Sequence, residues 1–482
     1  MTKGLRSVVL VWFAAFGIVG PVWGQAPRAA SDFAVMGAAK VLCSAVFTSG
    51  RELDEALRNS TSIFLAESDL DLLMSRGDDQ SDAAITLDRE AGTVQVTLHG
   101  YTGRAKYYGD QGCVLFPPGF NRVFFEPVSV ETTLPDAMSQ LWPMGDRLPD
   151  TPLPPELDRE KIKEAVDAAF SGDSLTMGFV VVYKGRIVGE RYGEGITKDT
   201  QLESWSMGKS LTATLLGVLV QQGHVGLHDR APVASWHEDP EDPRSRIRVS
   251  DLLRMSSGLH FTNASQPSYE WGRNMADHFY VYTGAVDAFT HSITRPVEFP
   301  PNTVGRYRNC DPLTIGYIIK QTVEKLGENY LAWPQKGLFD RIGIRRQVLE
   351  PDPYGNFLLT GYDYGTVRNW ARLGLLYSQD GVWEEERILP EGWAEFVSTP
   401  APGWDRPVYG GQFWVNGDGR WNLPKSTYYM SGAGGQHVFV VPSHDLVVAR
   451  QGHRRGASAS ARVLNVALGK IIDAIDREPV SQ

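Results

Sequence analysis

Apolar and polar residues alternate in two neighbouring segments near the N-terminus, 85–92 and 94–98, on either side of a glycine-containing turn. This alternation predicts a β-hairpin, because successive side chains of a strand point to opposite faces. A helix is expected over 33–47 and a further strand over 104–116. Together these elements predict a small N-terminal α+β unit.

A second set of strands is expected far apart in the chain. The segments 178–183 and 187–192 form a predicted hairpin, and two more strands are expected at 436–441 and 446–450. Helical spacing of apolar residues predicts helices over 159–170 and 458–475. The pattern favours an α+β fold in which one antiparallel sheet is closed by both ends of the region, flanked by helices and interrupted by a helical insert.

Seven prolines between residues 127 and 157 form a stiff stretch with few residues suited to a core. We expect a domain boundary there, with the N-terminal unit over 25–145 and the larger domain over 146–482. No internal repeat is evident.

The first 24 residues have the layout of a secretory signal peptide. Lys3 and Arg6 precede an apolar run from Val8 to about Val19, and Gly24 ends the segment. The run is shorter than the roughly 20 residues that span a bilayer. We therefore expect export to the periplasm or the medium, without stable membrane insertion after cleavage; an uncleaved anchor is the alternative.

Composition narrows the class of protein. The chain has 482 residues, 42% of them hydrophobic, and a net charge of −10 from 47 basic and 57 acidic side chains. These values exclude a collagen, a coiled coil and a disordered chain. No run of five or six basic residues occurs, so nucleic acid is not an expected partner. Oligomeric state cannot be inferred.

If the chain is exported, two of its three cysteines can form a disulfide that persists, which leaves one thiol. Cys43 and Cys113 both lie in the N-terminal unit, whereas Cys310 belongs to the larger domain. We expect a Cys43–Cys113 disulfide; three buried thiols are the alternative.

The strongest chemical signal is Ser206 followed three residues later by Lys209, at the start of a densely apolar helix that should end at Gly223. At this spacing the hydroxyl and the amine lie on roughly one face and can share a proton. The helix N-terminus would favour a developing oxyanion. The alternative is a capping serine and a lysine that reaches solvent.

Two further elements follow. Tyr307 and Asn309 lie on one side of a short segment expected to be extended; near a lysine, the pKa of a phenol can be lowered enough to take a proton. A competing Tyr354–Asn356 pair is interpreted as a turn, since Pro, Asp and Gly surround it.

The third element is the glycine-rich segment 431–436, which leads into a predicted strand. Its Gly435 permits a close backbone approach, and the backbone N–H of Gln436 could join that of Ser206 as an oxyanion donor. An ordinary glycine-rich start of a strand is the alternative.

The three elements, in this order, resemble the Ser-x-x-Lys, Tyr-x-Asn and Lys-Thr-Gly-like motifs of the penicillin-recognising serine hydrolases. The likeness is greatest to the class C β-lactamase-like branch that includes esterases and 6-aminohexanoate-dimer hydrolase. The flanking segments 247–259 and 369–377 are also similar to that branch. The resemblance covers residues 150 to 475.

This resemblance implies a β-lactamase/transpeptidase-like fold and hydrolysis of an ester or amide through an acyl-enzyme on Ser206. Lys209 would activate the serine, Tyr307 would act as general base and then acid, and Asn309 would orient the substrate. The amides of Ser206 and Gln436 would form the oxyanion hole. The chain departs from the motif at Ala433, where a cation is usual in β-lactamases, so neutral or cationic substrates are expected.

No cofactor and no metal are expected. His224 and His228 are separated by glycines that disfavour one helix face, and His437 should point away from Gln436 by strand alternation. The alternatives to an esterase or amidase are a β-lactamase or D,D-peptidase, and a non-catalytic binding protein. Five aromatic or imidazole side chains of the insert could line a pocket or fill a core: Trp271, His278, Phe279, Tyr280 and Tyr282.

Overall fold

The computed structural model describes residues 30–75, 82–263 and 275–475, so the predicted signal peptide lies outside it. The larger domain is built on a six-stranded antiparallel sheet of order β12-β13-β14-β15-β5-β6. Its strands are β5 (Thr176–Tyr183), β6 (Arg186–Tyr192), β12 (Trp414–Val415), β13 (Tyr428–Gly432), β14 (Gln436–Val441) and β15 (Leu446–Gly452). Because β15 pairs with β5, the sheet is closed by the two ends of the domain, as predicted.

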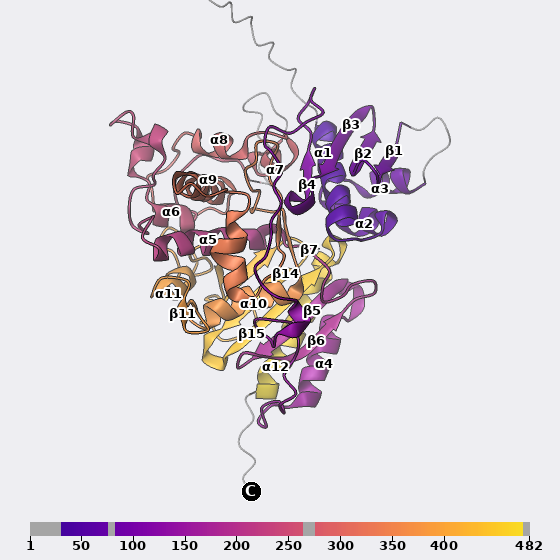
Figure 1. Ribbon diagram of the computed structural model, residues 1–482, viewed down its shortest axis with the longest axis vertical. Coiled ribbons are helices and arrows are strands. Elements are labelled where there is room, and N and C mark those ends of the chain that lie inside the picture. Colours follow the sequence, from indigo (N-terminus) through magenta and orange to yellow (C-terminus); the bar gives the residue numbers. More distant parts are fainter. Residues whose placement is uncertain (1–29, 76–81, 264–274, 476–482) are drawn as a thin grey trace, which may run out of the picture.

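Both faces of this sheet are covered by helices (Figure 1). Phe179 and Val181 face α4 (Arg159–Ala169) and α12 (Ala457–Ile475) in one hydrophobic cluster. Val180 and Val182 belong to the opposite cluster, which includes α5 (Gly208–Gln221) and α10 (Val367–Ser378). The strands therefore read as continuous apolar runs, since alternate residues are buried on either face.

Helices supply most of the regular secondary structure in the described part of the insert between α5 and α10, in keeping with the predicted helical insert. It contains α6 (Val249–Leu253), α7 (Asp277–Thr283), α8 (Ala288–Ile293) and α9 (Cys310–Lys325). A small sheet of order β7-β9-β8 joins it to the start of α5, with strands β7 (Leu202–Glu203), β8 (Val348–Leu349) and β9 (Asp363–Gly365). Strands of two or three residues are too short for alternation to reveal them. The remaining elements are β10 (Val382–Trp383), β11 (Glu386–Arg387) and α11 (Trp393–Ser398).

The N-terminal unit consists of three helices and a four-stranded antiparallel sheet; α1 packs on the sheet, and α2 packs on α1. The helices are α1 (Ala30–Cys43), α2 (Leu53–Ser60) and α3 (Glu67–Met74), and the strands are β1 (Ala84–Asp88), β2 (Thr93–Leu98), β3 (Tyr101–Tyr107) and β4 (Cys113–Leu115). The predicted hairpin is confirmed as β1 and β2. The single strand expected over 104–116 is wrong: Gly109 and Gly112 adopt positive φ and reverse the chain between β3 and β4.

The stretch after β4 is irregular until α4 begins, with a short 3₁₀ turn at Ala137–Ser139. Trp142 within it is buried in the core of the larger domain, and its indole N–H donates to the Gly185 carbonyl. The exact domain boundary remains a prediction. Among the described residues, no helix is long and apolar enough to cross a membrane.

The predicted disulfide between Cys43 and Cys113 is present, and Cys310 is a buried thiol. The bond ties the end of α1 to the start of β4 across a sequence separation of 70 residues.

Replacing Cys43 and Cys113 together by serine is expected to lower the free energy of unfolding by about 2–4 kcal/mol, because the crosslink restricts the unfolded chain. Urea unfolding followed by circular dichroism measures the change. Reductant should shift the midpoint of the parent protein and leave that of the double variant unchanged. Equal midpoints for parent and variant would contradict the expectation.

Candidate active site

Ser206 lies in a tight turn between β7 and α5. The turn is a 3₁₀ segment, Trp205–Met207, and Trp205 adopts a φ of 49°, a left-handed conformation that is costly for a bulky residue. Trp205 and Met207 are buried, whereas Ser206 is half-buried. The strained turn thus presents the serine hydroxyl at the surface of an otherwise closed segment.

Lys209 faces this hydroxyl from the first turn of α5. Its side chain is only 1% exposed, and its Nζ lies 2.9 Å from Ser206 Oγ and 2.9 Å from the carbonyl oxygen of Thr360. The lysine therefore does not reach solvent, and the expected pairing of Ser206 with Lys209 is present.

Burial controls the protonation of Lys209. Desolvation lowers the pKa of this amine well below its ordinary value, against the opposing negative charge of Asp363. Burial also raises the pKa of the Asp363 carboxyl, to about 8. Burial therefore opposes the charged form of each group. A neutral amine has a lone pair with which to accept the Ser206 proton.

Tyr307 is the third member of the group. Its ring centroid lies 4.9 Å from Lys209 Nζ, and its phenol hydrogen-bonds to the Ser206 side chain. The expectation that a neighbouring lysine lowers the phenol pKa is wrong. Burial raises the pKa of Tyr307, with the Ser206 hydrogen bond acting in the opposite direction, so the phenol keeps its proton at neutral pH.

Asn309 occupies a different position from the one expected. The segment is not extended at this residue, which has helical backbone angles and precedes α9. Its amide is fully buried, and its Nδ2 donates to the carbonyl oxygen of His278 at 3.1 Å. Asn309 also hydrogen-bonds to Tyr282, whose hydroxyl donates to the Thr360 carbonyl at 2.6 Å. Asn309 therefore joins the insert to the carbonyl that Lys209 contacts.

The glycine-rich segment turns beside the nucleophile. A Cβ on Gly432 would lie 2.1 Å from the Ser204 carbonyl oxygen and 3.1 Å from the Ser206 nitrogen, so only glycine allows this approach. Gly435 adopts a φ of 77° in the following turn. Gln436 is fully buried, and its amide donates to the Gly452 carbonyl at 2.6 Å and accepts from the Gly452 N–H at 2.8 Å.

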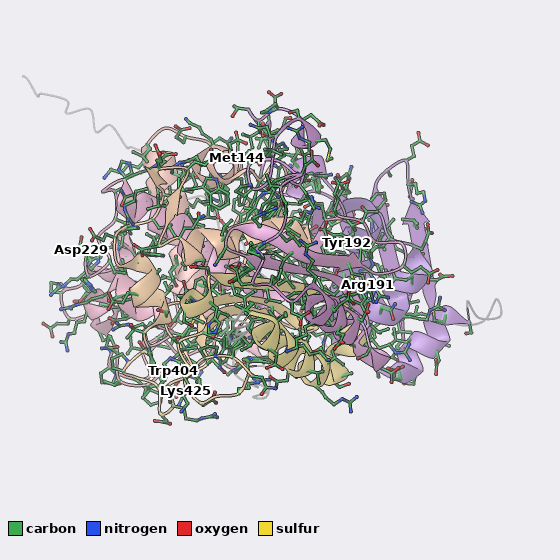
Figure 2. All side chains as sticks on the ribbon, turned by 90° about the horizontal axis from the view of Figure 1, so that it is seen from below. Met144, Arg191, Tyr192, Asp229, Trp404 and Lys425 are labelled. Carbon is green, nitrogen blue, oxygen red and sulfur yellow. A yellow bond between two sulfur atoms is a disulfide. The ribbon has the colours of Figure 1, made fainter. Side chains whose placement is uncertain are left out.

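Aromatic side chains next to Tyr307 were missed by sequence reasoning. Trp414 stacks on Tyr307 with centroids 5.3 Å apart, and Tyr409 meets the same ring edge-on at 6.0 Å. Trp404 stacks on Tyr409, on the side of the molecule opposite Arg191 and Tyr192 of β6 (Figure 2). These residues lie in irregular segments or at strand ends, where no periodicity marks them.

The aromatic and imidazole side chains considered in the insert differ in their distance from the site and in their burial. His278 is half-buried near Lys209; burial, and then the Lys209 charge, lower its pKa to about 3. Phe279 and Tyr280 are half-buried and Tyr282 is buried, while Trp271 lies outside the described residues.

The structure also shows the surroundings of two other segments that were considered as candidate sites, around Tyr354 and His437. The competing Tyr354–Asn356 segment forms a turn, with Tyr354 40% exposed. His437 stacks on Phe439 with centroids 5.2 Å apart and has a packing role. Within residues 30–75, 82–263 and 275–475, no cluster of three or more His, Cys, Asp or Glu is suited to hold a metal.

The chain is similar to a known protein family and to several solved structures. A family model described as beta-lactamase matches residues 159–470. A provisionally assigned 6-aminohexanoate-dimer hydrolase from Bacillus anthracis superposes with a TM-score of 0.52 at 17% identity, covering 71% of this chain and 91% of that one.

Two further solved structures share the fold. A provisionally assigned β-lactamase from Bacteroides dorei has a TM-score of 0.51 at 17% identity, covering 66% of this chain and 99% of its own. A penicillin-binding protein homologue from Caulobacter crescentus has a TM-score of 0.50 at 15% identity, with the same two coverages. At these identities the likeness concerns the fold.

Proposed function

Because the chain belongs to the beta-lactamase family, we propose that it is a serine hydrolase that cleaves an ester or amide bond through an acyl-enzyme on Ser206. The observation that carries the proposal is the buried Lys209 amine, 2.9 Å from the hydroxyl of the half-buried Ser206. A desolvated amine beside an accessible serine is the arrangement that nucleophilic catalysis requires.

In the proposed first step, Ser206 Oγ attacks the substrate carbonyl while its proton passes to Lys209. The tetrahedral intermediate then collapses, and the leaving group departs with a proton delivered through the Tyr307 phenol. Water then attacks the acyl ester and gives up a proton to the same pair. The bond between Ser206 Oγ and the acyl carbon breaks, the pair returns the proton to Oγ, and the acid is released. Since its pKa is raised, Tyr307 serves in this scheme as a protonated relay, and Lys209 is the base.

The oxyanion would be stabilised by the Ser206 N–H together with an N–H of the 433–436 turn. The close approach of Gly432 to the Ser206 nitrogen supports this pairing. Arg450 donates to the carbonyls of Gly434 and Gly435 at 2.9 and 2.7 Å. Because carbonyl and N–H point in opposite directions in a trans peptide, Arg450 turns the N–H groups of Gly435 and Gln436 away from itself.

The proposed substrate is a neutral or cationic ester or amide. The turn beside the nucleophile contains Ala433 in place of a cation, and aromatic rings flank Tyr307. A β-lactamase or D,D-peptidase, the second candidate within the family, recognises a carboxylate that this turn does not attract.

The catalytic efficiency for 4-nitrophenyl butyrate is expected to exceed that for a chromogenic cephalosporin by about 10- to 100-fold, the value of one charge-assisted hydrogen bond. Steady-state kinetics with both substrates measure the ratio. A phenyl ester with an added carboxylate serves as the matched anionic control and should be cleaved more slowly than its neutral counterpart. Preference for the cephalosporin would favour the β-lactamase alternative.

Labelling with a fluorophosphonate probe tests the proposal directly. We expect one adduct per chain, located on Ser206 by peptide mass spectrometry. The neighbouring Ser204 is fully buried and provides an internal control that should stay unmodified. An unlabelled protein that also hydrolyses no ester or amide would support the non-catalytic alternative.

We also propose that the protein acts outside the cytoplasm. The Cys43–Cys113 disulfide supports this location, because such bonds persist in oxidising compartments.

A further inference from the structure

The small β7-β9-β8 sheet supports the reactive groups. β7 leads directly into the turn that holds Ser206. Thr360, whose carbonyl contacts Lys209, lies just before β9, and Asp363 of β9 accepts a hydrogen bond from Ser204. The positions of Ser206 and Lys209 therefore depend on strands of only two or three residues.

The N-terminal unit contacts one edge of this sheet through a buried ion pair. Arg51 Nη1 lies 3.2 Å from Glu203 Oε2, and the two residues are 6% and 5% exposed. Ser60 donates to the other Glu203 oxygen at 3.1 Å. Glu55 fixes the guanidinium by two further hydrogen bonds of 2.9 and 2.8 Å. Glu203 is the last residue of β7, three positions before Ser206.

The same unit contacts the opposite edge through a second buried pair, between Lys40 of α1 and Glu350, the residue after β8. Ser44 donates to Glu350 at 2.8 Å, and the Cys113 N–H donates to it at 2.8 Å. The Cys43–Cys113 disulfide holds α1 and β4 together around this carboxylate. Each edge strand of the small sheet thus ends at a carboxylate that is hydrogen-bonded to the N-terminal unit.

A ring from the N-terminal unit packs on the nucleophile turn itself. Phe64 lies over Gly37 of α1, where a Cβ would come within 2.5 Å of the ring. The Phe64 ring also contacts Trp205 and Phe279, at centroid distances of 6.3 and 6.2 Å. Phe64 therefore supports the residue with the strained φ that immediately precedes Ser206.

We propose that the N-terminal unit is a working part of the active site, in which Arg51 acts as a positioning residue for Ser206 through Glu203. This inference rests on the proposed function of Ser206. Removing the guanidinium leaves Glu203 buried without its cation, so β7 shifts and the hydroxyl moves away from Lys209. Displacements of about 1 Å at a reacting atom can cost 10²-fold in rate.

The test compares Arg51→Gln and Arg51→Lys with Arg58→Gln, a control on the exposed side of α2, the helix that begins two residues after Arg51. Two readouts are the rate constant for inactivation by a fluorophosphonate and the kcat for 4-nitrophenyl butyrate, both measured well below the Tm of every variant. Arg51→Gln should lower both at least about tenfold with KM within twofold. Arg51→Lys should restore part of the loss, and Arg58→Gln should match the parent.

Two other variants keep the test decisive if Arg51→Gln does not fold. Arg51→Met combined with Glu203→Gln removes both charges, and Phe64→Ala withdraws the ring from Trp205 without touching a charge. Each should slow inactivation at unchanged probe affinity. Folded variants that react as fast as the parent would overturn the inference and leave the proposed function intact. A parent protein that takes up no probe at Ser206 would instead overturn the proposed function.

Discussion

Replacing Ser206 by alanine is expected to lower kcat/KM for a nitrophenyl ester by roughly 10⁴- to 10⁶-fold, as for the removal of other serine nucleophiles. In the proposed mechanism Ser206 Oγ forms the acyl bond, and alanine leaves the turn and its backbone N–H in place. The rate of hydrolysis by the variant should fall close to the rate that substrate binding and the oxyanion donors alone support.

Steady-state and single-turnover kinetics measure this loss, with circular dichroism to show that the fold is kept. Ser443→Ala, on an exposed turn, is the matched control and should retain full activity. A Ser206→Ala variant that hydrolyses esters within tenfold of the parent would place the nucleophile elsewhere.

Replacing Lys209 by methionine is expected to lower kcat/KM by about 10²- to 10⁴-fold, the usual contribution of a general base. Methionine has a side chain of similar length and can fill the buried space of the lysine side chain. It has no lone pair basic enough to accept the serine proton. Lys209→Arg should be as inactive, because a guanidinium stays charged in this pH range.

The direction of the Lys209 pKa shift determines how kcat/KM should depend on pH. Below its pKa the amine is protonated and cannot accept the Ser206 proton, so kcat/KM should rise with pH. Because burial lowers this pKa well below its ordinary value of 10.5, the midpoint of the rise should lie well below pH 10.5. Profiles of kcat/KM from pH 5 to 10 measure it, and a rise centred near pH 10.5 would contradict a neutral lysine base.

Local spacing explains why part of the site could be predicted from sequence. Ser206 and Lys209 are three residues apart at the start of one helix, so helical geometry alone brings them together. The short apolar runs in 436–441 and 446–450 likewise predicted two sheet strands within two residues of their observed ends. Cys43 and Cys113 were paired because the third cysteine lay in another domain.

The remaining features depend on contacts between distant segments. Arg51 and Glu203 are 152 positions apart, and the Thr360 carbonyl that contacts Lys209 belongs to an irregular segment without a motif. The direction of the Tyr307 pKa shift was wrong because the sequence shows a neighbouring lysine but not the burial that outweighs it. Asn309 was expected on an extended segment, whereas the start of α9 turns its amide toward His278.

The pairing of β5 with β15 has a consequence for the order in which the protein matures. Ser206 is synthesised early, but the turn beside it belongs to residues 432–436, and the sheet is complete only when β15 has joined β5. The strands of the N-terminal unit pair in sequence order, and α1 packs on them, so this unit can fold once residues 30–115 have emerged. The proposed active site therefore stays incomplete during synthesis, and any activity that depends on it can appear only after nearly the whole chain has been made.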